Sequence, residues 1–378
     1  MRPVKTMQEI PFYDLGGAVR DIRAELLAAA GAVIDSGHYI MGGALKRFEA
    51  EFAAYCGVRH AIGVGNGLDA ITLILRGLGI GPGDEVLVPG HTFVATWLAV
   101  SQCGATPIAV DIDPATHNID PALVPAAITP RTKAILAVHL YGRAAPMTAL
   151  AEIAAAYGVA LIEDSAQAHG ATHGGRTVGG LAAAAAFSFY PTKNLGALGD
   201  GGAVTTNDDA LAARVRKIRN YGSQIKYLHE EVGMNSRLDE LQAAFLSARL
   251  CHLPSQTQRR KALALRYDAA LADIHGVTRP IIDPEAVWHL YVVRSSARDR
   301  LQAALAERGV STLVHYPIPP HQQPIYRATH GGAVLPESEA AAREVLSLPF
   351  WPEMEDRVVD EVAARLREAA VTAGRCQE

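Results

Sequence analysis

The 378-residue chain has few cysteines and no large excess of charge of either sign. Cys56, Cys103, Cys251 and Cys376 lie far apart, without the paired spacing of a zinc site or a disulfide framework. The net charge of −4 provides no basic surface for a polyanion. We therefore expect free thiols and no nucleic-acid partner.

Long hydrophobic runs are absent as well. The run Ile71-Thr72-Leu73-Ile74-Leu75 ends at Arg76, far short of the ~20 residues that a membrane-spanning helix needs. The first residues, Met1 to Lys5, become polar at once and contain no apolar core of a signal peptide. Hydrophobic residues make up 49% of the chain and charged residues 20%, which is typical of soluble globular proteins. We expect a cytoplasmic protein without a membrane partner.

The signatures of several common activities are also missing. The stretch Gly63-Val64-Gly65-Asn66-Gly67 is not the dinucleotide fingerprint G-x-G-x-x-G, because Leu68 occupies the position of its third glycine. This argues against a nicotinamide dehydrogenase. Neither G-x-S-x-G nor H-E-x-x-H occurs, and the histidines of the loop 315–324 have no third ligand at a useful spacing. We expect neither a serine hydrolase nor a metal site.

What is present is an alternation of short apolar runs with helical patterns, from about residue 61 to about residue 207. This alternation is typical of a mostly parallel sheet covered by helices. Seven runs have the character of strands: His60 to Val64, Glu85 to Val88, Thr106 to Val110, Ala134 to Leu140, Val159 to Ile162, Ala184 to Ser188 and Gly202 to Thr205. The stretches 68–76, 95–103 and 147–157 have helical periodicity and lead into glycines, as helix ends often do.

The length exceeds what one ordinary core needs, so we predict two domains. Residues 1–250 form a large α/β domain with a mostly parallel seven-stranded sheet flanked by helices. Residues 251–378 form a smaller α+β domain. An N-terminal helix, about 17–36, is expected to pack on one of the two, with the small domain as a candidate. The segment 235–240 predicts a helix leaving the large domain, with Ser236 as its N-cap.

Lys193 and Asp164 are the most informative pair of side chains. Lys193 lies between aromatic residues, a proline and a glycine, and an amine that condenses with an aldehyde needs such a structured, desolvated turn to lose its proton. Asp164 lies just past a predicted buried strand, where a carboxylate can keep a proton on a pyridine nitrogen. Taken singly, the first is most simply explained as a surface residue and the second as a cap. Together they indicate pyridoxal chemistry.

Three further features can complete such a site. The glycine turn before Leu68 offers free backbone N–H groups and a helix dipole to a phosphate, although a turn without any ligand explains the glycines equally well. Ser188 can add its hydroxyl to the same phosphate. Phe93 follows another predicted strand and can lay its ring against a cofactor, although a single aromatic of this kind is more often part of a core.

In these segments the chain resembles the sugar aminotransferases of the aspartate-aminotransferase superfamily, from about Ile10 to about Pro352. The resemblance depends on the segments 36–42, 81–86, 163–167, 188–196 and 200–203. The stretches 219–223, 226–227 and 235–244 resemble most the branch that aminates C3 of nucleotide-linked keto-deoxyhexoses.

The resemblance implies the fold of type I pyridoxal 5′-phosphate (PLP) transferases and a homodimer with shared active sites. Lys193 is then the Schiff-base lysine and proton shuttle, Asp164 the partner of the pyridine nitrogen, and Gln167 a contact of the ring hydroxyl. The remaining implied contacts are with the phosphate (the Gly67 and Leu68 amides, Ser188, and Asn235 of the neighbouring subunit), with the ring face (Phe93) and with the sugar nucleotide (Tyr221, Arg237, His315 and Tyr316). Many members have threonine where this chain has Leu68, so one hydroxyl contact is missing here.

The implied reaction moves an amino group from glutamate to a nucleotide-linked, and by this resemblance dTDP-linked, 3-keto-6-deoxyhexose. Three alternatives stay open. One is an aminotransferase acting at C4. Another is a sugar dehydratase of the same fold, which carries histidine where Lys193 stands. The third is a non-catalytic sensor that only binds cofactor or sugar.

Overall fold

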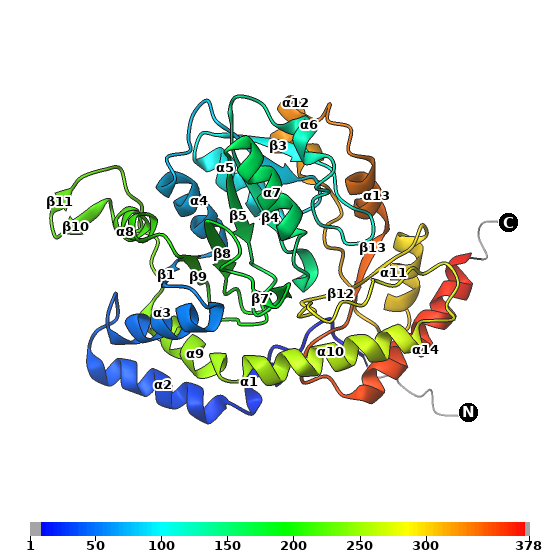
Figure 1. Ribbon diagram of the computed structural model, residues 1–378. Coiled ribbons are helices and arrows are strands. Elements are labelled where there is room, and N and C mark those ends of the chain that lie inside the picture. Colours follow the sequence, from blue (N-terminus) through cyan, green and yellow to red (C-terminus); the bar gives the residue numbers. More distant parts are fainter. Residues whose placement is uncertain (1–8, 375–378) are drawn as a thin grey trace.

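The computed structural model of the protein describes residues 9–374. Its centre is a seven-stranded sheet in the order β1-β9-β8-β5-β4-β2-β3 (Figure 1). These strands are β1 (His60–Val64), β2 (Glu85–Pro89), β3 (Thr106–Val110), β4 (Thr132–Val138), β5 (Ala160–Asp164), β8 (Ala184–Ser188) and β9 (Gly202–Thr206). Only β9 runs against the others, pairing antiparallel with β1 and β8. All seven predicted strands are confirmed, with bounds that differ by at most two residues.

Helices cover both faces of the sheet because successive strand residues point to opposite sides. On β2, Val86 and Val88 lie in one core with α4 (Gly67–Gly77), α5 (Val94–Gln102) and α8 (Asp209–Ile218). Leu87, between them, lies in another core with α6 (Val124–Ala127) and α7 (Met147–Tyr157). These strands are therefore buried on both faces, as a parallel sheet requires. The three predicted helices of this region correspond to α4, α5 and α7.

A third core lies over the end of the sheet that contains β1, β9 and β8. It packs Phe48 and Phe52 of α3 (Gly43–Cys56) against Phe187 and Phe189, with ring centroids 4.9 to 5.4 Å apart in edge-on pairs. Helix α9 (Glu240–Leu250) completes this layer, and α2 (Arg23–Ser36) packs along α9. The predicted N-terminal helix is present as α1 (Gly17–Arg20) followed by α2.

The helix predicted from Asn235 begins later than expected, and the prediction of Ser236 as its N-cap is wrong. The observed helix, α9, starts at Glu240. The buried Glu240 carboxylate accepts hydrogen bonds from backbone N–H groups at the start of α3. Ser236 turns toward the sheet instead. Its Oγ accepts from the Gly65 N–H at 3.0 Å and donates to Asp69 Oδ2 at 2.6 Å. This bond to the glycine turn holds the segment extended.

The C-terminal part of the chain builds a separate core. It is formed by α10 (Leu253–Ala270), β12 (Tyr291–Arg294), α11 (Arg298–Ala306), β13 (Val345–Leu348) and α14 (Asp356–Gly374). The same part of the chain contains η2 (Pro320–Gln322), α12 (Pro324–His330) and α13 (Pro336–Glu344), and Tyr326 of α12 packs in the core of the sheet. The core gathers aromatic rings of Tyr267, Tyr291 and Phe350, and Ile10 from the N-terminal segment joins it. The remaining small elements are η1 (Leu140–Gly142), β6 (Thr172–His173) and β7 (Arg176–Thr177).

One hairpin stands away from the rest of the ribbon, beside α8 (Figure 1). It contains β10 (Ser223–Ile225) and β11 (Leu228–His229). Apolar side chains here reach solvent in this single chain: Ile225 is 65% exposed, Tyr227 84% and Val232 83%. Such a cluster is uncommon on a surface without a partner.

Within residues 9–374, no helix combines the length and the apolar character that crossing a bilayer requires. In the same range, Cys56, Cys103 and Cys251 are free thiols.

Candidate active site

A cavity of about 540 Å³ opens at the carboxyl ends of β5 and β8, where ligands collect in open α/β sheets. The start of α4, the start of α5 and the loop after β8 line it. Three residues from the C-terminal part of the chain, His289, His315 and Tyr316, close another wall. Sequence positions more than 200 residues apart therefore meet in one cavity.

Asp164 ends β5 and faces this cavity from the α4 and α5 side of the sheet. Its Oδ2 accepts a hydrogen bond from Thr96 Oγ1 at 2.9 Å, and its Oδ1 accepts from the Ala166 N–H at 3.2 Å. Burial raises the pKa of the carboxyl, while these two donors and the charge of Lys193 act in the opposite direction. A further cationic N–H donor would favour the ionised form.

Thr96 belongs to a short chain of hydroxyl groups. A carboxylate oxygen only accepts, so the Thr96 hydroxyl donates its hydrogen to Asp164. The Thr96 Oγ1 therefore accepts from Thr92 Oγ1, which lies 2.9 Å away. Both threonines are buried, with 1% and 2% of their surface exposed. Sequence analysis missed them. Their spacing of one helical turn next to Phe93 was the available signal, but a threonine at that spacing is common in any helix.

Lys193 lies in the loop between β8 and β9, which folds back on itself through backbone bonds from Lys193 N–H to Tyr190 O and from Ala197 N–H to Phe189 O. Its amine faces the cavity and makes no hydrogen bond or ion pair with another described residue. Burial lowers the pKa of this amine to about 8, although the charge of Asp164 opposes the shift. The amine therefore loses its proton far more readily than an exposed lysine.

The phosphate-binding features predicted from the glycine turn meet at the start of α4. Asn66 caps this helix by accepting from the Asp69 N–H at 2.8 Å, which leaves the N–H groups of Gly67 and Leu68 directed at the cavity end. A Cβ atom at Gly67 would lie 2.8 Å from Ser188 Cβ. Only glycine lets the helix start lie this close to β8, so the N–H groups and the Ser188 hydroxyl can share one anion.

Gln167 connects the two parts of the chain across the cavity. Its Oε1 accepts from the Tyr141 N–H at 2.7 Å, and its Nε2 donates to Tyr316 Oη at 3.0 Å. Tyr141 has φ 59°, in the left-handed region, and this bond stabilises that conformation. The Tyr141 hydroxyl donates in turn to the carbonyl oxygen of His315. One hydrogen of the Gln167 amide stays free for a ligand.

Phe93 is the N-cap residue of α5 and lies at the mouth of the cavity. Its ring is 54% exposed and packs against Tyr316 with centroids 5.4 Å apart. An aromatic that is half exposed in the free chain and lines a cavity can cover a flat ligand.

Tyr221, Asn235 and Arg237 do not line the cavity of their own chain. They form a separate group: Arg237 stacks over the Tyr221 ring at 5.5 Å and donates to Asn220 Oδ1 at 3.1 Å, while Asn235 pairs with Asn220 through the backbone. Asn235 is exposed and Tyr221 is 48% exposed. The predicted site residues therefore fall into two sets, one inside the cavity and one on the surface beneath the β10–β11 hairpin.

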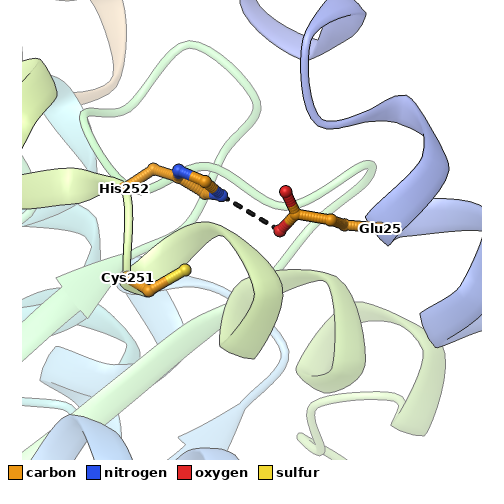
Figure 2. Close-up of side chains that lie close together, drawn as sticks. All are labelled: Glu25, Cys251 and His252. Atoms are coloured by element: carbon orange, nitrogen blue, oxygen red, sulfur yellow. Dashed lines mark hydrogen bonds and ion pairs between the residues drawn. The ribbon is translucent and has the colours of Figure 1, made fainter.

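A set of three possible metal ligands lies outside the cavity, at Glu25, Cys251 and His252 (Figure 2). His252 Nε2 is 3.0 Å from Glu25 Oε2, and the Cys251 thiol donates to the Ala248 carbonyl oxygen at 3.2 Å. These existing bonds explain the cluster as a hydrogen-bonded contact that joins α2 to the start of α10. In the loop considered above, His315 bonds Ser347 and His321 bonds Glu339.

Comparison with known proteins supports an aminotransferase. The chain is 54% identical to dTDP-3-amino-3,4,6-trideoxy-alpha-D-glucose transaminase of Streptomyces venezuelae, over 93% of this chain and 95% of that protein. It is 50% identical to dTDP-3-amino-3,6-dideoxy-alpha-D-galactopyranose transaminase of Aneurinibacillus thermoaerophilus, over 93% and 97%. The crystal structure of S. venezuelae DesV in complex with a ketimine intermediate matches with a TM-score of 0.94 and 52% identity, over 96% of this chain and 98% of that one.

Enzymes of this kind depend on PLP, and the cavity fits that group. A free amine with a lowered pKa, a buried carboxylate that lacks a cationic donor, and a glycine-lined helix start against Ser188 match its aldehyde, ring nitrogen and phosphate. The predictions of fold, cofactor and enzyme class are confirmed. Residues 20–367 match the model of the DegT/DnrJ/EryC1/StrS aminotransferase family, and the chain belongs to this family of PLP-dependent sugar aminotransferases.

Proposed function

We propose that this enzyme transfers an amino group from glutamate to C3 of a dTDP-linked 3-keto-6-deoxyhexose. The observation that carries the proposal is one cavity that holds Lys193 and Asp164, in a chain about half identical to two transaminases of dTDP-linked 3-amino sugars. When bound there, PLP supplies the electron sink that makes a carbon-bound hydrogen acidic.

Lys193 provides the amine that holds the cofactor and then moves the proton in both half-reactions. A pKa of about 8 leaves a useful share of it unprotonated near neutral pH. Asp164, with Thr96 and Ala166 as donors, keeps a proton on the ring nitrogen. Gln167 contacts the ring hydroxyl.

The other cavity residues orient the ligands. The N–H groups of Gly67 and Leu68 and the hydroxyl of Ser188 hold the phosphate. Phe93 covers the ring face and excludes water. His315 and Tyr316, on the wall formed by the C-terminal part of the chain, lie next to the sugar nucleotide.

We propose a homodimer in which Asn235 reaches the phosphate of the partner's site, with Tyr221 and Arg237 facing the partner's sugar nucleotide. Their absence from their own cavity and the exposed apolar hairpin beside them support this arrangement. A mixing experiment tests it, using Lys193→Ala and Asn235→Ala chains that are each inactive alone. After mixing by partial unfolding and refolding, shared sites restore about a quarter of the native activity, because half of the dimers are mixed and each has one native site. Sites built within one chain restore none.

The core shared by α10, β12, α11, β13 and α14 supports a division of the chain into two domains. We propose a large PLP-binding domain of residues 1–250 and a small domain of residues 251–378, with α10 as the first element of the latter. The free thiols support a reducing compartment, and we propose the cytoplasm.

The function is tested with purified protein. Glutamate is expected to bleach the yellow cofactor absorbance, and addition of the dTDP-linked 3-keto sugar to restore it with formation of a 3-amino product, identified by NMR. If the enzyme aminates a 4-keto isomer in preference to the 3-keto sugar, the C4 alternative replaces the proposal. Lys193→Ala is expected to lose both steps.

A further inference from the structure

His289 is a cavity residue that sequence analysis did not identify. It lies just before β12 and lines the same cavity as Lys193, with 6% of its surface exposed. Burial and the positive charges of Lys193 and Arg260 lower the pKa of its imidazole well below the usual value. The ring is therefore neutral at physiological pH, with a proton on only one nitrogen.

Asn194 decides which nitrogen carries that proton. The Asn194 Nδ2 donates to the Val287 carbonyl oxygen at 3.2 Å, and a carbonyl oxygen only accepts, so this bond fixes the orientation of the amide. Its Oδ1 then lies 3.1 Å from His289 Nδ1. Because Oδ1 also only accepts, Nδ1 must carry the proton. The other nitrogen, Nε2, has a free lone pair.

Two unmatched groups thus share the cavity. His289 Nε2 makes no hydrogen bond with another described residue, and neither does the amine of Lys193. One is an acceptor without a donor, and the other has N–H groups without an acceptor. Since Asn194 follows Lys193 directly, the loop that carries the amine also sets the tautomer of the imidazole that can receive it.

We propose that His289 is a positioning residue, whose Nε2 accepts a hydrogen bond from the Lys193 amine whenever that amine is not covalently engaged. The inference rests on the role of Lys193 in the proposed function. A free primary amine rotates about its Cε–Nζ bond, and fixing one N–H on His289 leaves the nitrogen lone pair directed at the proton it must remove. Better alignment raises the rate of proton transfer in each half-reaction.

The first test uses cofactor-free protein and does not depend on turnover. The rate at which trinitrobenzenesulfonate modifies Lys193, identified by peptide mass spectrometry, is measured against pH. In the native chain this rate should rise tenfold per pH unit and level off near the lowered pKa of about 8. The His289 acceptor stabilises the ammonium form of Lys193. His289→Leu removes this acceptor, so the midpoint should fall by about one pH unit. His289→Gln keeps an acceptor oxygen and should restore most of the shift.

The second test follows a single half-reaction of the loaded enzyme with glutamate that carries deuterium at Cα. His289→Leu should slow the step about tenfold and increase the isotope effect, because proton transfer becomes more strongly limiting. His321→Leu is the matched control, because it removes another buried imidazole, one that does not line the cavity. It should change neither midpoint nor isotope effect.

Other groups near Lys193 offer a competing explanation. The charge of Lys193 acts to lower the pKa values of Asp164, His169 and His315, and His315 lines the cavity. An unchanged midpoint and isotope effect in folded His289→Leu overturns the proposal, as does a shift produced by His315→Leu instead. The Lys193→Ala variant tests the proposed function instead, because it removes the amine on which both readouts depend. The failure of the His289 proposal and the failure of the proposed function are therefore distinguishable.

Discussion

Glu163 and Asp164 are adjacent carboxylates on β5, and both are buried, yet they meet different surroundings. Glu163 points to the α7 side of the sheet, where it accepts from the backbone N–H groups of Gly179, Leu181 and Ala182 at 2.8 to 3.1 Å. It also accepts from Nε2 of His139 at 3.1 Å; that nitrogen carries the proton because Nδ1 accepts from the Ala145 N–H.

Asp164 points to the opposite side and has only two donors, and the cavity lies beside it. The alternation of side chains along a strand therefore separates two roles by a single residue. A carboxylate surrounded by four donors stabilises the fold, whereas one with unfilled acceptor capacity is available to a ligand.

The largest effect should come from the unsaturated carboxylate. In the proposed function, Asp164 keeps the cofactor's ring nitrogen charged, so kcat of Asp164→Ala should fall by ~10³-fold or more. The measurement is steady-state turnover with glutamate, normalised to the cofactor content determined by absorbance. The variant should keep the far-ultraviolet circular dichroism of the native protein. Near-native kcat in a fully loaded variant would contradict the assigned role.

Glu163→Gln should act on stability instead. The amide places an NH₂ group against backbone donors and leaves N–H groups of the 179–182 turn unsatisfied, so the free energy of unfolding should fall by about 3 kcal/mol. Urea denaturation followed by circular dichroism measures this change. Turnover per folded, loaded site should stay within about threefold of native. A collapse of kcat at unchanged stability would reverse the comparison between the two carboxylates.

Thr96→Val sharpens the comparison by removing one of the two donors of Asp164. The hydroxyl opposes the rise in pKa caused by burial, so its loss raises the pKa of the carboxyl further. The ionised form then exists only at higher pH, and the acidic limb of the kcat/KM profile should move upward by about one unit. Thr96→Ser keeps the hydroxyl and should leave the limb in place. An equal movement in both variants would point to packing rather than hydrogen bonding.

Much of the fold was predictable because the strands are short apolar runs separated by helical periods. The strand ends placed Asp164, Ser188 and the glycine turn at one edge of the sheet. Ser236 was misassigned because a serine before an apolar stripe satisfies the rule for an N-cap equally well, and only the tertiary contact with Gly65 decides between the two.

The contacts across the cavity could not be predicted from the sequence, for a different reason. His289 and Thr96 are ordinary residues for a buried segment and a helix, and nothing in their neighbours marks them. Their importance comes from the partners they meet, Asn194 and Asp164, which lie 95 and 68 positions away in the chain. Periodicity describes one element at a time, so it cannot report such pairs.

The reversed direction of β9 has a consequence for how the loop that carries Lys193 is made. Had β9 run parallel to β8, the chain would have had to return to the opposite edge of the sheet before β9 could begin. Because β8 and β9 are antiparallel neighbours, their connection stays at one edge, and Phe189 N–H bonds the Gly201 carbonyl oxygen at 2.7 Å across its base. The backbone bonds within this loop are thus local in sequence, and they can form before the C-terminal wall docks on Asn194.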